Sequence, residues 1–424
     1  MQNVINDPEK RKKLVVYINP PYAEASNKRT LTRGVEGNRG VEQSRVNQKY
    51  AKRLGQGNAE LFAQFLTRIY FEIPTCFIAH FSKLKIITGQ HFVDFRKFFK
   101  AELKKAFICP ANTFDNVKGQ FPISFMIWDT KNTIELNVVT TDVYDKNKKN
   151  LGDKTYYAHH NGHYINEWIK PFRADVSKNQ LIGKFPFKGN DFQNQNMIQV
   201  VHHKMDYNTE AGHFFINQVN IMQACVYIAV RHCIAATWLN DRDQFLYPND
   251  AWQEDTEFQN DCFMYVLFSN NIRSQYGTNH WIPFTEQEVE ASEKFESNFM
   301  AKYIQGKVDT KITFDLFQKV VQEEQKPLQF SATATAVFNA GRELWKYYHQ
   351  RIKDIPTWTG LERNVNASLY DIKAYFQGKN DKGKMNSKSE DETYMHLLAN
   401  LREALQLLAQ KIEPKVYDYG FLKR

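Results

Sequence analysis

The sequence predicts an α/β region followed by a mainly helical region, and three observations support this class. A short apolar run from Leu14 to Ile18 stops at two prolines, which is typical of a buried strand that ends in a rigid loop. Helical and strand periodicities then alternate as far as Trp128. From Phe214 onward, the apolar residues are spaced almost throughout as in helices.

Composition sets the broad limits. The chain has 424 residues, 42% of them hydrophobic and 24% charged, which is enough for two or three globular domains. No apolar stretch reaches the ~18 residues needed to span a bilayer, and no signal-peptide core follows the basic residues 9–13. We therefore expect a cytoplasmic protein without a membrane partner. The net charge of +9 suits a polyanionic partner but does not identify one.

The first region divides into alternating elements. Pro74 separates a helix from a strand, and a polar turn at 116–119 sits inside a predicted hairpin. The predicted order is a helix over 58–71, a strand over 76–81, a helix over 93–107, a strand over 107–109 and a strand over 121–128.

The middle and last regions are predicted more coarsely. A second hairpin is expected over 134–157 with its turn at 145–150, and short strands are expected at 181–187 and 197–201. We divide the chain into 1–133, a β-rich insert at 134–205 and a helical region at 206–424. Its helices are predicted over 215–239, 256–268, 285–304, 332–351, 367–376 and 390–412.

The loop after the first strand carries side chains that suit a planar, amino-bearing ring. Asn19 offers an amide oxygen and Pro20 a carbonyl as hydrogen-bond acceptors, and Tyr22 offers a flat ring for stacking. Pro21 restricts the shape of the loop. Ligands of open α/β sheets bind beyond the carboxyl ends of the strands, where this loop starts. The alternative is a plain junction between a strand and a turn.

Asn19-Pro20-Pro21-Tyr22 after a hydrophobic strand resembles the catalytic motif of S-adenosylmethionine-dependent amino-methyltransferases, above all the N6-adenine DNA methyltransferases of bacterial restriction-modification systems. Residues 78–84 and 119–129 resemble later motifs of these enzymes. Residues 279–284 and 340–348 are similar, more loosely, to the C-terminal regions of large methylases. Protein-glutamine methyltransferases share the four-residue motif, but the long chain after the hairpin favours DNA.

The resemblance implies a partial Rossmann-like methyltransferase sheet, double-stranded DNA as substrate and S-adenosyl-L-methionine as methyl donor. Asn19 and Pro20 would accept hydrogen bonds from the exocyclic amine of adenine and aim its lone pair at the donor. Tyr22 would stack on the base after it has been flipped out of the duplex. Pro21 would set the shape of the loop.

A complete methyltransferase also needs a strand followed by a Gly-rich turn for the donor. Only residues 1–13 precede Leu14, and no such turn occurs elsewhere in the sequence. The nearest match, Val337 to Gly341, falls in a predicted helix. We therefore assign no donor-binding residue, and expect the donor-binding half to be missing or supplied by a second polypeptide.

The polar segment 26–54 is strongly basic and contains several glycines. It is either a phosphate clamp next to the catalytic turn or a solvated loop. The candidate DNA contacts are Lys28, Arg29, Arg33, Arg39 and Arg45. A second basic stretch, 378–389, is either flexible or another backbone contact, and the hairpin at 134–157 either touches DNA or braces the sheet.

The remaining clusters point to no chemistry. The five cysteines form no Cys-x-x-Cys pair, so we expect buried thiols and no metal. Asn161-Gly162 interrupts the spacing of the histidines at 159–163, which disfavours a metal site there. The acidic residues between Asp241 and Glu257 are expected to form a solvated loop rather than a nuclease centre.

Two readings of the function remain open besides a DNA adenine N6-methyltransferase. One is a non-catalytic DNA-binding or specificity component descended from a methylase. The other is a protein-directed amino-methyltransferase that methylates a glutamine side chain.

Overall fold

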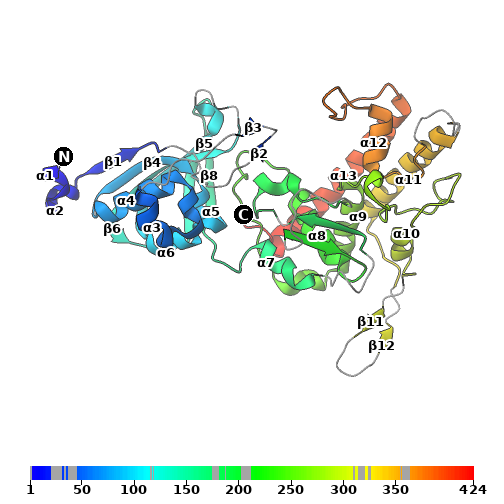
Figure 1. Cartoon of the computed structure of the whole chain (residues 1–424), viewed down its shortest axis with the longest axis horizontal. Helices are drawn as coiled ribbons and strands as arrows, with labels where there is room; N and C mark the ends of the chain where they lie inside the picture. The colour runs from blue at the N-terminus through cyan, green and yellow to red at the C-terminus, as the bar shows by residue number, and fades with distance from the viewer. Residues whose placement is uncertain are drawn as a thin grey trace.

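The computed structural model describes residues 2–20, 31–32, 35–36, 45–114, 117, 119–173, 181–186, 188–201, 212–308, 311–313, 320–322, 326–353, 355 and 363–424. A mixed sheet with helices forms one end of the molecule, and a helical region forms the other (Figure 1). This arrangement confirms the coarse prediction of an α/β region followed by a mainly helical one.

The elements of the sheet end come first along the chain. They are α1 (Gln2–Ile5), α2 (Pro8–Arg11), β1 (Val15–Ile18), β2 (Leu31–Thr32), β3 (Val35–Glu36), α3 (Arg45–Leu54), α4 (Leu61–Glu72), β4 (Phe77–Lys83), α5 (Lys85–Thr88), α6 (Val93–Phe98), β5 (Ala101–Pro110), β6 (Pro122–Thr133), β7 (Val138–Tyr144) and β8 (Asn150–Tyr157).

The elements of the helical end follow. They are α7 (Ile165–Ile169), β9 (Gly183–Pro186), β10 (His213–Ile216), α8 (Ile221–His232), α9 (Thr256–Ser269), α10 (Phe299–Ile304), β11 (Lys311–Thr313), β12 (Val320–Gln322), α11 (Ala332–Lys353), α12 (Leu369–Gln377) and α13 (Glu392–Asp418).

Six strands form the main sheet in the order β1-β4-β6-β5-β7-β8. The pairs β1–β4 and β5–β7 are parallel, and the other neighbours are antiparallel. The hairpin expected at 134–157 forms as β7 and β8. It extends the main sheet, because Phe107 and Ile108 of β5 pair with Asp142 and Val143 of β7.

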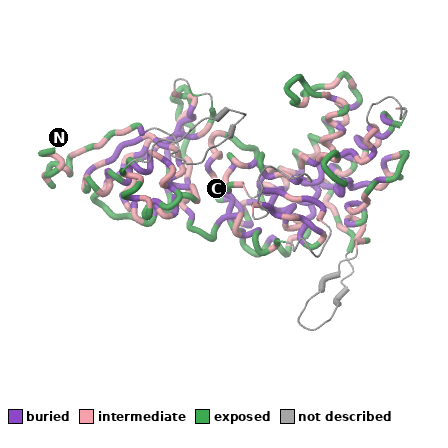
Figure 2. The backbone as a smooth tube through the Cα atoms, viewed as in Figure 1, coloured by how far each residue is buried: buried purple, intermediate pink, exposed green. Residues whose placement is uncertain are grey.

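Helices cover one face of this sheet. Strand alternation points Ile78, Met126 and Trp128 to the same face, where they pack with Phe62 of α4 and Phe95 of α6 in a buried core. A second and larger core joins α8, α9, α11 and α13. The change from one core to the other falls between Ala158 and Ile165, and Figure 2 shows buried stretches at both ends of the molecule.

Three predicted helices are too long. The helix expected over 93–107 ends at Phe98, because residues 101–110 pair with β6 as a ten-residue strand. The helix expected over 215–239 is limited to Ile221–His232, after the strand His213–Ile216. Of the helix expected over 285–304, only Phe299–Ile304 forms, since the Glu286 side chain accepts a hydrogen bond from the backbone N–H of Phe295 and fixes a loop there.

Candidate functional site

The predicted Asn-Pro pair lies at the carboxyl end of β1. In the parallel pair, Ile18 lies opposite His80, and β4 continues beyond this point to Lys83. Asn19 and Pro20 therefore leave the sheet beside the last residues of β4. Asn19 is exposed and Pro20 is buried. The other two residues of the motif, Pro21 and Tyr22, lie outside the described residues.

β1 is an edge strand. Within the part of the chain that the structure describes, it pairs with β4 and with no second strand. Val15 and Tyr17 are 57% and 63% exposed, and Val16 and Ile18 on the other face are half-buried. The prediction of a buried strand is therefore wrong. An edge of this kind offers backbone N–H and C=O groups to a further strand.

An aromatic strip continues from β1 across the sheet. The Tyr17 ring centroid lies 6.3 Å from that of Phe125, which lies 4.8 Å from Phe81 and 5.4 Å from Phe107. These rings are on the face opposite the helices, and the three phenylalanines are half-buried. This strip was not predicted from the sequence, although aromatic residues at alternate positions of the strands indicate it.

A buried histidine packs on the other face of the sheet. The indole N–H of Trp128 donates a 3.0 Å hydrogen bond to His80 Nε2. Burial lowers the pKa of His80 from 6.5 to about 4, so the ring is neutral at pH 7. His80 therefore has a structural role between β4 and β6 and is not a candidate general base.

Of the five candidate DNA contacts, the structure describes only the last one, Arg45. Arg45 is exposed at the start of α3, and Lys28, Arg29, Arg33 and Arg39 lie outside the described residues. Two later cations of the same segment contribute to the fold. Lys49 pairs with Glu72 at 3.0 Å, and the guanidinium of Arg53 lies 4.6 Å from the Phe71 ring centroid.

The described glycines do not form a donor turn. Gly341 lies inside α11, where a Cβ atom would come within 2.2 Å of the Phe268 ring, so this glycine serves close packing. Gly55 has a φ of +52° and follows a helix rather than a strand. Neither glycine therefore lies in a turn between a strand and a helix that would fit S-adenosylmethionine.

Among the residues whose positions are described, no group of three or more His, Cys, Asp or Glu side chains could hold a metal ion. Burial, followed by the charges of Lys423 and Arg96, lowers the pKa of His159 to about 4. His202 and His203 lie outside the described residues. The described helices include none that is both long and apolar enough to cross a membrane.

The sequence predicted a solvated acidic loop, and this prediction is only partly correct. Asp250, Glu254 and Glu257 are exposed, but other acidic side chains of the cluster are held in ion pairs. Asp243 pairs with Lys154 of β8 at 2.8 Å, and both side chains are mostly buried. Asp255 caps α9 and pairs with Lys415 at 3.0 Å. The lysines come from distant parts of the sequence, which is why local composition did not reveal these pairs.

No family model matches the chain, and no curated protein sequence matches it.

Proposed function

We propose that this chain is the base-binding half of a DNA adenine N6-methyltransferase, with the donor-binding half supplied by a second polypeptide. The observation that carries the proposal is the position of Asn19 and Pro20 at the carboxyl end of β1, beside the parallel strand β4. This is the edge at which open α/β sheets bind ligands.

The chemistry of the motif supports the assignment. The amine of adenine is conjugated into its ring and is a weak nucleophile. Two acceptors held on a rigid loop, the Asn19 amide oxygen and the Pro20 carbonyl, bind its hydrogens and turn its lone pair out of the ring system. Tyr22 stacks on the extruded base, and Pro21 fixes the loop that carries these groups.

The order of elements is also what the second half of a Rossmann-like methyltransferase sheet requires. β1 is followed by helices and by the parallel strand β4, and then by helices and the β5–β6 hairpin, whose second strand lies between β4 and β5. The open edge of β1 is where a further strand of the donor-binding half would pair. S-adenosyl-L-methionine is the donor by resemblance.

The direct test mixes the chain with a polypeptide that carries the Gly-rich turn, and measures methyl transfer to adenine in duplex DNA. We expect activity only in the mixture, and loss of at least about 100-fold with Asn19→Ala, as for the removal of one such polar group in an active site. Asn400→Ala, at an exposed position in α13, is the matched control and should keep full activity.

Calorimetry separates this proposal from a complete enzyme. The chain alone should bind S-adenosyl-L-methionine weakly or not at all, because its sequence has no strand followed by a Gly-rich turn. Tight, stoichiometric binding to the chain alone would show that a donor site had been overlooked.

The lack of a donor turn also favours a second candidate, a non-catalytic DNA-binding or specificity component. Such a protein would bind DNA with a strong salt dependence but would not methylate it in either condition. Transfer to a glutamine-containing peptide instead of DNA would identify a protein-directed enzyme.

A further inference from the structure

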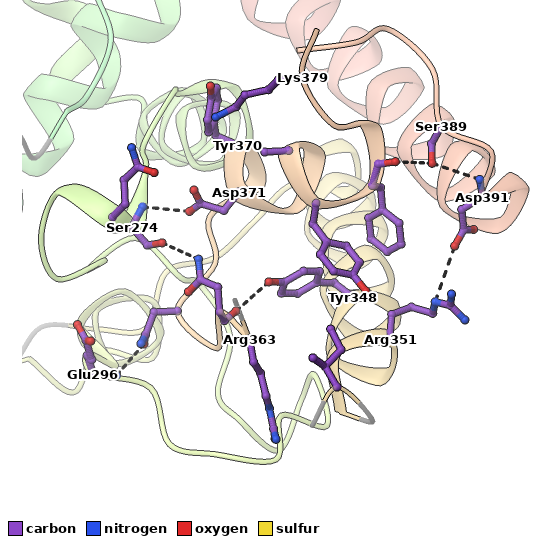
Figure 3. A pocket seen from close by; sticks show the side chains of 17 residues that line it. Ser274, Glu296, Tyr348, Arg351, Arg363, Tyr370, Asp371, Lys379, Ser389 and Asp391 are labelled. Carbon is purple, nitrogen blue, oxygen red and sulfur yellow. Dashed lines mark hydrogen bonds and ion pairs between the residues drawn. The ribbon is translucent and has the colours of Figure 1, made fainter. Parts of the chain in front are cut away.

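An open cleft of about 870 Å³ lies in the helical region, between α11, α12 and the loop that contains Ser274 and Glu296. Tyr370 and Lys379 lie together at one rim, and Arg351 and Asp391 lie on the other side (Figure 3). The lining is mainly polar and aromatic. This cleft is separate from the Asn19 loop in the sequence and belongs to the other hydrophobic core.

Two of the three acids in this cleft are occupied by hydrogen bonds within the fold. Asp371 accepts from the backbone N–H groups of Ser274 and Ser368, at 3.0 and 2.9 Å. Asp391 accepts from the backbone of Tyr394 and from the hydroxyl of Tyr347, both at 2.9 Å. Asp391 also pairs with Arg351 at 3.9 Å, so it offsets positive charge on that side of the cleft and not at the rim of Tyr370 and Lys379 (Figure 3).

The segment 378–389, which we call the basic turn, forms one rim of the cleft. Asn380 Oδ1 accepts 3.0 Å hydrogen bonds from the backbone of Lys382 and Lys384, and the Asn386 side chain donates to the carbonyl of Gln377 at 2.9 Å. Gly378 and Gly383 supply the positive φ angles that this compact loop needs. In the structure this segment is therefore a hydrogen-bonded loop.

The lysines of the basic turn order it through their backbone groups and not through ion pairs of their ammonium groups. Lys379, Lys382, Lys384 and Lys388 are all exposed, and in the described part of the chain none has a carboxylate within ion-pair distance. Asp381 is the one acidic residue in the segment. A loop that is ordered by amide hydrogen bonds and presents four exposed ammonium groups is suited to a polyanion.

Two cations gather around one aromatic ring beside this turn. The Arg273 guanidinium lies 4.2 Å from the centroid of Tyr370, and Lys379 Nζ lies 5.7 Å from it. Both distances are within the range of cation–π attraction. The ring therefore holds charges from two distant segments close together at the mouth of the cleft.

We propose that the basic turn, with Arg273 and Lys379 around Tyr370, binds the phosphate backbone of duplex DNA. The choice of DNA as the polyanion rests on the proposed function. In this arrangement the Asn19 loop engages the target base, and the basic turn holds the same duplex at a second place. Its lysines contribute affinity without reading the sequence, because phosphates carry no base information.

The test is the salt dependence of duplex binding, measured by fluorescence anisotropy with the full chain. Removing three lysines with K382Q/K384Q/K388Q should lower the slope of log affinity against log salt by about 2 to 3, since each phosphate contact contributes about 0.9. The charge-preserving variant K382R/K384R/K388R should keep the wild-type slope. The matched control K302Q/K307Q/K326Q removes three exposed lysines elsewhere in the helical region and should also keep it.

The outcomes distinguish this inference from the proposed function. An unchanged slope with K382Q/K384Q/K388Q, or an equal loss with the control, overturns the inference even if Asn19-dependent methylation is present. A lower slope, together with no methylation when the donor-binding polypeptide is added, supports the inference and removes the enzymatic proposal. Preferential binding of RNA, or no binding of duplex DNA by the wild-type chain, also overturns the inference.

Discussion

His80 shows how one buried residue sets the acid stability of the sheet. Its folded pKa is lowered by burial from 6.5 to about 4. As the pH falls from 6.5 to 4, the unfolded chain takes up a proton that the folded chain does not, so the stability present above pH 6.5 is lost across this window. His80→Gln keeps an acceptor for the Trp128 N–H and does not titrate. Between about pH 7 and 5 it should lose about 2 kcal/mol less stability than the wild type.

Urea unfolding at the two pH values measures this difference. Equal losses in the wild type and in His80→Gln would mean that the folded protein takes up the proton at His80 as readily as the unfolded chain does. Burial would then not lower the pKa of the ring as the structure indicates.

For single residues, the sequence predicted a position correctly only where that position depends on neighbouring residues in the chain. Asn19 and Pro20 were correctly expected at a strand end, because the apolar run and the prolines are adjacent. The exposure of Tyr17 was not foreseen, because it depends on whether β1 lies at the edge or in the middle of the sheet. Residue spacing within one strand does not contain that information.

At the scale of elements, pairing with distant strands determines the secondary structure where the local pattern fits both a helix and a strand. Phe95, Phe98 and Phe99 follow helical spacing, but the chain from Ala101 forms a strand because β6 and β7 pair with it on both sides. Helices with caps or a strong apolar stripe were predicted closely. The helix expected over 256–268 is observed as Thr256–Ser269, with Asp255 as its N-cap.

Gly341 gives a test of element packing. Alanine favours a helix over glycine by about 1 kcal/mol, but a Cβ atom here would lie 2.2 Å from the ring of Phe268 in α9. Overpacking of this kind costs about 1–3 kcal/mol. Gly341→Ala should therefore destabilise the helical region, as measured by urea unfolding, despite the gain in helix propensity.

The double variant Gly341→Ala/Phe268→Leu provides the control. A smaller side chain at 268 makes room for the new methyl group, so the double variant should lose less stability than the sum of the two single variants. Strict additivity would show that the glycine is needed for a reason other than contact with Phe268.

At the scale of the whole molecule, both apolar and polar contacts between described residues join the two regions. Trp238 and Leu239 of the helical region pack against the core of the sheet. Lys154 of β8 pairs with Asp243 of the helical region at 2.8 Å, with side chains 19% and 17% exposed. The Tyr156 hydroxyl donates to the carbonyl of Leu239 at 3.2 Å. Contacts between segments so distant in sequence are beyond what composition or periodicity can predict, which is why the acidic residues near 243 were taken for a solvated loop.

From the Lys154–Asp243 pair we predict that removing Lys154 lowers the free energy of unfolding by an amount that depends on pH. Burial raises the pKa of Asp243 from 3.8 to about 6, and Lys154 opposes that rise. Without Lys154 the pKa rises further, so the folded state loses stability as the pH increases from the unfolded value of 3.8 through the folded one. Lys154→Met should cost about 2 kcal/mol or more near pH 7.5, and much less near pH 4.5, where the carboxyl is already protonated in the folded protein.

Lys104→Met is the matched control, because Lys104 pairs with Glu102 at 3.0 Å in the same sheet but at a more exposed position. An exposed pair contributes little, so this variant should change stability slightly and equally at both pH values. Urea unfolding of both variants against the wild type at each pH measures the effect. If Lys154→Met had the same cost at both pH values, packing of the lysine stem, and not the charge of Asp243, would connect the sheet to the helical region.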